Sequence, residues 1–126
     1  MNILVYSGNV ASTPDVKLID DKKLLTSFTV AVKDNRAIKL ADGKDRAIFV
    51  RTIAWDALAK ICAENLQRGN HVTVHGRLNI RGYIANGKKQ FITECIAECV
   101  DFTMKNENVV EMQTDYKSVE LGGSER

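Results

Sequence analysis

Phe49, Arg51 and Trp55 are the residues of this sequence whose types and spacing best suit a chemical task. They lie in the apolar run Ala47–Trp55, and in a β-strand their side chains share one face. Two rings flanking a guanidinium suit a binding face, because bases stack on rings and the cation meets phosphate. The alternative is that both rings belong to the core and Arg51 extends its charged end into water from the edge. This strand alone leaves both interpretations open.

A second group of cations and rings follows in residues 71–89. The alternation over His71–Tyr83 predicts a strand with an apolar inward face and a polar outward face. The inward residues are Val72, Val74, Leu78 and Ile80. The outward residues with chemistry are Arg77, Arg81 and Tyr83, and the following hairpin carries Lys88 and Lys89. This mixture suits single-stranded nucleic acid, where stacking contributes about 1–3 kcal/mol per base. The alternative is a hairpin whose charges are simply solvated.

The sequence offers little for catalysis or metal binding. His71 and His75 share a strand face, but no serine or cysteine is placed by motif to form a nucleophile–base pair with them. The three cysteines, Cys62, Cys95 and Cys99, form no regular disulfide framework. They also lack the neighbouring ligands that structural zinc requires. We therefore expect no enzymatic activity, no metal site and no cofactor.

Size and composition indicate one globular domain. The chain has 126 residues, of which 44% are hydrophobic and 27% charged. Residues 1–104 hold 15 Lys and Arg against 11 Asp and Glu, whereas residues 105–126 hold 3 against 5. A mildly basic body with an acidic tail suits a polyanion-binding domain, although many other proteins share this balance. The sequence shows no signal peptide and no long apolar span, so a cytoplasmic, nucleoid-associated location is expected.

The order of the expected elements predicts the fold class. The helix is expected at Asp56–Leu66, capped by Asp56, and Asn86-Gly87 marks a hairpin. The expected strands are 2–10 continuing at 16–19, then 24–33, 47–55, 71–83 and 90–102. This order predicts an all-β OB-fold, a five-stranded Greek-key barrel with its helix between the third and fourth strands. Asp34–Arg46 is expected to be a mobile loop, residues 1–104 the binding domain, and residues 105–126 a short disordered tail.

The sequence resembles bacterial single-stranded DNA-binding proteins over about residues 1–104. No single segment carries the resemblance, but the order and spacing of the segments make it specific. The matching segments are Asn2–Val10 with Pro14-Asp15, Phe28–Val32, Ile53–Trp55 with Leu58–Lys60, Leu66–Leu78, and Tyr83 with Asn86-Gly87 and Phe91–Glu94.

The resemblance implies a role for particular positions. It places Phe49, Trp55 and Tyr83 at the base-stacking positions of the family. Arg51, Arg68 and Arg81 fall where the family has cations that contact phosphate. Arg36 stands where many members have another stacking tryptophan, and a guanidinium plane can also stack on a base.

The resemblance also implies the wider function. A protein of this kind coats single-stranded DNA without strong sequence preference during replication, recombination or repair, with no cofactor and no membrane contact. One fold per chain implies a homotetramer. The sequence ends Leu121–Arg126 rather than in the acidic tip with Pro-Phe that recruits partner proteins, so recruitment through the tail is not expected and a specialised branch of the family is favoured.

Two further functions stay open. One is a primosome-type OB-fold protein that bridges replication-restart partners, which would form a dimer and bind DNA weakly. The other is a structural interaction module in which the aromatic residues belong to the core or to a protein interface.

Overall fold

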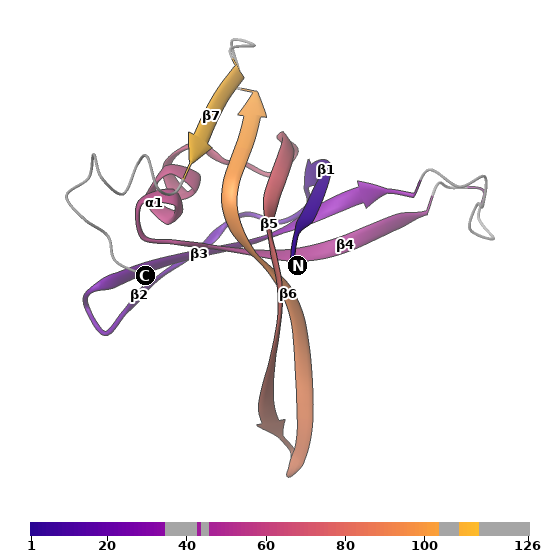
Figure 1. The fold of residues 1–126 in the computed structure, drawn as a ribbon, viewed down its shortest axis with the longest axis vertical. Coiled ribbons are helices and arrows are strands. Elements are labelled where there is room, and N and C mark those ends of the chain that lie inside the picture. The colour runs from indigo at the N-terminus through magenta and orange to yellow at the C-terminus, as the bar shows by residue number, and fades with distance from the viewer. Residues whose placement is uncertain (35–42, 44–45, 104–108, 114–126) are drawn as a thin grey trace.

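The computed structural model describes residues 1–34, 43, 46–103 and 109–113. These residues form strands and a single helix (Figure 1). The elements are β1 (Leu4–Val10), β2 (Asp15–Ile19), β3 (Lys23–Lys33), β4 (Ala47–Trp55), α1 (Asp56–Asn65), β5 (His71–Ala85), β6 (Lys88–Thr103) and β7 (Val109–Gln113). Within these residues, no helix is long and apolar enough to span a bilayer.

Five strands pair in a ring in the order β1-β5-β6-β4-β3, which closes because β1 also pairs with β3. Strand β2 pairs with β3 outside the ring. All the pairs in the ring are antiparallel except β4 with β6. The β1–β3 and β4–β6 joints are short, with two residue pairs each. This ring, with its one helix between β4 and β5, is the topology of an OB-fold, so the predicted fold class is confirmed.

The inward side chains of the ring and the covering face of α1 form the core. Val30, Val72 and Val74 have no exposed surface, and Leu58 of α1 is equally buried against the sheet. The hydroxyl of Thr26 donates a hydrogen bond of 2.8 Å to the carbonyl of Ala59, which ties β3 to the helix. The body of the protein is thus held by apolar burial, the largest favourable contribution to folding.

The helix is where the sequence predicts it, but its cap is not. The N-cap residue is Trp55, with extended backbone dihedrals, and no side chain makes a capping hydrogen bond there. Asp56 is already the first helical residue. The prediction that Asp56 caps the helix is therefore wrong, because β4 runs directly into α1 without a linker in which a capping residue could sit.

Gly8 permits the close approach of β1 to β3. A Cβ atom at this position would collide with the backbone of Ala31. Next to it, Asn9 and Val10 pair with β3, and the amide of Ala11 donates to the carbonyl of Thr29 at 2.8 Å. The glycine therefore allows one of the two short joints of the ring to form.

The outer part of the β5–β6 hairpin, residues 77–94, projects from the body as a two-stranded ribbon that we call the arm (Figure 1). Asn86 and Gly87 have φ values of 53° and 75°, which fit a type I′ turn and confirm the predicted hairpin. Leu78 and Ile80 were predicted to be buried, but they are 45% and 58% exposed. Both continue the inward side of Val72 and Val74, yet the arm extends past the strands that would cover them.

The stretch after Met104 contains one more strand. β7 pairs with β6 between Val109–Gln113 and Cys99–Thr103. The sequence predicts a disordered tail over residues 105–126, but the structure places the backbone of residues 109–113 in the sheet. The division of the chain at residue 104 stays a prediction, as does the mobile loop, most of which lies outside the described residues.

Candidate nucleic-acid interface

The outward side of β4 presents Phe49 and Arg51 to solvent. Phe49 is 66% exposed, and Arg51 is also exposed. Their partners on β3 are Ala31 and Thr29, whose side chains are too small to cover a ring or a guanidinium. Trp55, at the other end of the strand, is half-buried. The ring of Phe49 is therefore not a core residue, which removes one of the two interpretations that the sequence left open for it.

A buried carboxylate joins the outward sides of three strands. Glu94 of β6 has only 4% of its side chain exposed. Its Oε1 accepts a hydrogen bond from Nε of Arg81 on β5 at 3.1 Å, and Nε of Arg51 on β4 lies 3.6 Å from the same oxygen. Nδ2 of Asn79 donates to Oε2 at 3.3 Å. One carboxylate thus holds two arginines from different strands side by side, and the three charges sum to one positive charge.

Glu94 is a member of this candidate site that the sequence pattern did not reveal. It lies in an apolar stretch of β6, between Thr93 and Cys95. A carboxylate in such a stretch signals a buried ion pair, because an unpaired charge is strongly unfavourable in the interior. The signal was present, but the partners could be found only once the pairing of β4, β5 and β6 was known.

The arm has two different sides. Directly opposed residues of an antiparallel pair point to the same side, and the register pairs Arg81 with Ile92, Tyr83 with Gln90 and Ala85 with Lys88. Tyr83, 42% exposed, therefore shares a side with Arg81 and Lys88. Lys89 pairs with Ile84 and points to the opposite side, with its Nζ 5.5 Å from the centre of the Phe91 ring. Lys88 and Lys89, which the sequence predicts to bind together, therefore lie on opposite sides of the arm.

Comparison with known proteins matches the sequence of this chain to one family. Residues 1–103 match the sequence profile of the single-strand binding protein family. The chain belongs to the single-strand binding protein family. As a member, it carries the family's OB-fold in the part of the chain that contains Phe49, the Glu94 cluster and the arm.

Individual members of the single-strand binding protein family are similar over most of this chain. A protein of Listeria monocytogenes named single-stranded DNA-binding protein 2 is 34% identical over 115 residues, covering 90% of this chain and 71% of that protein. The single-stranded DNA-binding protein of Bacillus cereus is 33% identical over 103 residues, covering 81% and 59%. Single-stranded DNA-binding protein 1 of Clostridium acetobutylicum is 32% identical over 104 residues, covering 81% and 93%.

The structure gathers most, but not all, of the predicted site residues of this family member. Arg77 lies on the Tyr83 side of the arm, and its Nη1 is 3.6 Å from Oε2 of Glu98, with both side chains about half-exposed. Arg68 is exposed in the turn before β5, where the amide of Gly69 donates to the carbonyl of Val10, so it stands at the opposite end of β5 from Tyr83. Arg36 lies outside the described residues.

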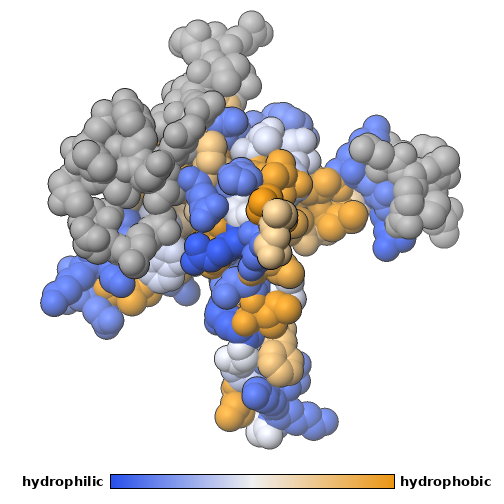
Figure 2. Space-filling view, in the orientation of Figure 1, coloured by the Kyte–Doolittle hydropathy of each residue, from blue (hydrophilic) through white to orange (hydrophobic). Residues whose placement is uncertain are grey.

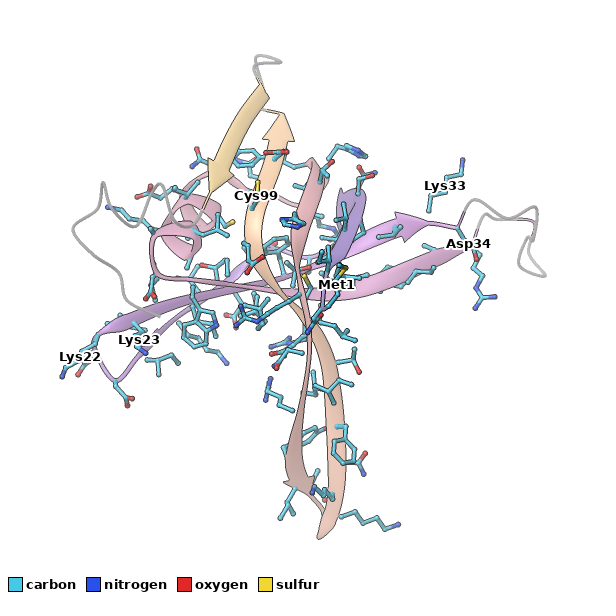
Figure 3. The ribbon with its side chains drawn as sticks, in the orientation of Figure 1. Met1, Lys22, Lys23, Lys33, Asp34 and Cys99 are labelled. Carbon is cyan, nitrogen blue, oxygen red and sulfur yellow. The ribbon has the colours of Figure 1, made fainter. Side chains whose placement is uncertain are left out.

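Other polar groups of this family member stand apart from the interface. Lys22 and Lys23 lie at the tip of the β2–β3 hairpin, away from the arm (Figure 3). Burial raises the pKa of the Cys62 thiol to about 12 and also raises the pKa of Cys95, so both remain protonated at neutral pH. In the part of the chain that the structure describes, no three His, Cys, Asp or Glu residues are grouped to hold a metal ion.

Proposed function

We propose that this chain binds single-stranded DNA without strong sequence preference. The observation that carries the proposal is the continuous outward surface on which the Glu94 cluster joins Arg51 of β4 to Arg81 of β5, with the exposed ring of Phe49 on one side and Tyr83 on the other. Two cations then stand together in the middle of this surface, with one ring at each end. The names of the similar proteins in Listeria, Bacillus and Clostridium support the same ligand.

In the proposed mechanism, bases stack on Phe49, Trp55 and Tyr83. Every base has a π-face, so stacking tolerates any sequence. Arg51 and Arg81 contact phosphates, since 42% and 48% of their side chains are exposed despite the contact with Glu94. The further phosphate contacts in this proposal come from Arg68, Arg77, Lys88 and Lys89, with Arg36 as an additional stacking or phosphate contact. These contacts weaken as salt rises, because each neutralised phosphate releases a counterion.

The proposal is for a binding protein, not an enzyme, that coats exposed strands in DNA replication, recombination or repair. We also propose that it acts as a homotetramer. Ile3, just before β1, and Val5 on β1 are 60% and 61% exposed, which suits burial against a second copy. Sedimentation analysis separates this assembly from the dimer expected of a protein that bridges replication-restart partners: a tetramer supports the proposal, and a dimer contradicts it.

The test is a titration of the protein with oligo-dT, followed by tryptophan fluorescence. Trp55 is the only tryptophan of the sequence, so the signal reports on one site. We expect strong quenching by the single strand, little by a duplex of the same length, and an affinity that falls as salt rises. Saturating oligo-dT without quenching would contradict stacking on Trp55, and no binding by any method would contradict the proposed function itself.

A further inference from the structure

The side of the arm that carries Lys89 and Phe91 contains an open pocket of about 450 Å³. It is lined by Gly82, Tyr83, Ile84, Lys89 and Phe91. Phe91 is 63% exposed and Ile84 78% exposed. In the space-filling view, hydrophobic and hydrophilic residues alternate along the arm (Figure 2). The volume falls within the range of small-ligand sites, about 300–1,000 Å³.

The register explains how the pocket forms. Gly82 is paired with Phe91 and Ile84 with Lys89, so these four residues share one side of the ribbon. A Cβ at Gly82 would lie 3.4 Å from Cε of Lys89 and 3.5 Å from Cε1 of Phe91. Both side chains therefore flank the space above the glycine, and the missing side chain at residue 82 leaves that space open.

The residues around this space repeat the chemistry of the first side. Nζ of Lys89 lies 5.5 Å from the centre of the Phe91 ring, so one aromatic face and one cation stand together. Phe91 adds little to the stability of the arm, because 63% of it is exposed to solvent among the described residues. A ring beside an ammonium group fits a nucleotide, whose base has a π-face and whose phosphate carries the negative charge.

We propose that this pocket is a second nucleotide site on the arm, in which a base stacks on Phe91 and its phosphate contacts Lys89. The occupant is the same single strand that crosses the first side, because Tyr83 belongs to that side and also lines the pocket. A bound strand passes over the edge of the arm from Tyr83 to Phe91. This inference rests on the proposed function, since it extends the path of the same ligand.

The experiment compares three variants of the full chain in oligo-dT titrations read by Trp55 fluorescence, which is remote from the arm tip. Phe91→Leu keeps an apolar side chain but removes the stacking ring. Gly82→Val keeps Phe91 and Lys89 and fills the space between them; the backbone of Gly82 does not have a positive φ, so valine fits there. Ile80→Ala is the matched control, because Ile80 is an exposed apolar residue on the same side but does not line the pocket.

We expect Phe91→Leu and Gly82→Val each to lower the affinity for a strand of about 16 nucleotides roughly tenfold, the effect of one lost stacking contact. A strand of about 6 nucleotides, too short to reach around the arm, should bind each variant as tightly as it binds the unaltered protein. Ile80→Ala should bind both strands normally. Thermal melting of each variant identifies any loss of affinity that comes from misfolding.

Two results would overturn the inference. If Phe91→Leu and Gly82→Val bind the long strand as tightly as the unaltered protein, the pocket is not a nucleotide site, although the proposed function stands. If they lose affinity only together with a change in sedimentation that Ile80→Ala shares, this side of the arm is a contact between copies of the chain. Absence of binding by the unaltered protein would instead refute the proposed function.

Discussion

Strands β5 and β6 run through both the body and the arm, yet their apolar residues are buried in the body and exposed in the arm. In the body, Val72 and Val74 of β5 have no exposed surface. In the arm, Ile80 and Ile84 of the same strand are 58% and 78% exposed. Burial in the core explains why Val72 and Val74 are apolar, but it does not explain why Ile80 and Ile84 are. The apolar residues of the arm therefore have to be explained by what the arm binds, because they contribute little to its folding.

The apolar residues of β5 change from buried to exposed near Gly76. Leu4 of β1 pairs with Gly76, the last pair in the β1–β5 register, and the β5–β6 register shifts between His75 and Gly76. Beyond this irregularity β6 is the only strand neighbour of β5 among the described residues, and a two-stranded ribbon alone is marginally stable in water. The base of the arm is held instead by polar contacts. Asn2 exchanges two hydrogen bonds with the backbone of Leu78, close to the position of Met1 in Figure 3, and Glu94 ties the arm to Arg51 of β4.

The same substitution in the two regions gives the largest expected contrast. Phe28→Ala in the body, where Phe28 is 2% exposed, should lower the free energy of unfolding by about 3–5 kcal/mol, because it leaves a cavity in the core. Phe91→Ala in the arm should change it by no more than about 0.5 kcal/mol. Chemical denaturation of both variants measures the difference. If both variants lost the same free energy of unfolding, Phe91 would have to be packed as Phe28 is, and the body and the arm would not differ in burial.

Tyr83→Ala tests the arm from the side of binding. The loss of one stacking ring should weaken oligo-dT binding by about 1–3 kcal/mol, and the denaturation midpoint should not move, because Tyr83 is 42% exposed. Affinity is measured by titration in a buffer of fixed salt concentration. A Tyr83→Phe variant is the matched control, since it keeps the ring and should bind normally. A variant that unfolds more easily and binds as before would place Tyr83 in the structure rather than in the interface.

How much the sequence predicts also differs between the two regions. Local patterns correctly predicted the strands up to residue 103, the helix and the Asn86-Gly87 turn, because these depend on neighbours in sequence, but they missed β7. Alternation also gave the correct side for Leu78 and Ile80. It could not give their burial, because that depends on whether other strands cover the face, and the arm projects beyond them.

The candidate site shows the same limit. The types and spacing of Phe49 and Arg51 suggested a binding face, but only the small partners Ala31 and Thr29 on β3 show that the face is open. Glu94 was missed because its partners come from β4 and β5, so the pattern of β6 alone does not reveal the cluster. The binding roles of all the predicted site residues, including stacking on Trp55 and the contact from Arg68, stay predictions.

Glu94→Gln should strengthen the binding of single-stranded DNA. The change removes the negative charge beside Arg51 and Arg81, so we expect about fivefold tighter binding at low salt, roughly 1 kcal/mol. The dependence of log affinity on log salt should steepen by about one, because one more phosphate is neutralised by the protein. Glu98→Gln, beside the half-exposed Arg77, is the control with a smaller expected effect. Weaker binding at every salt concentration would show that Glu94 matters more for placing the arginines than for offsetting their charge.

Ile84→Thr should have the smallest effect on stability. It tests most directly whether the apolar residues of the arm are exposed, unlike those of the body. The substitution keeps the β-branched shape that suits a strand and removes apolar surface at a position that is 78% exposed, so the free energy of unfolding should change by less than about 0.5 kcal/mol. The measurement is the melting temperature at two protein concentrations well separated from each other. A drop in melting temperature that varies with concentration would mean that copies of the chain bury this residue, because association stabilises the folded state by mass action. The arm would then be a second packing region, and its exposed apolar residues would be explained by assembly instead of by a bound strand.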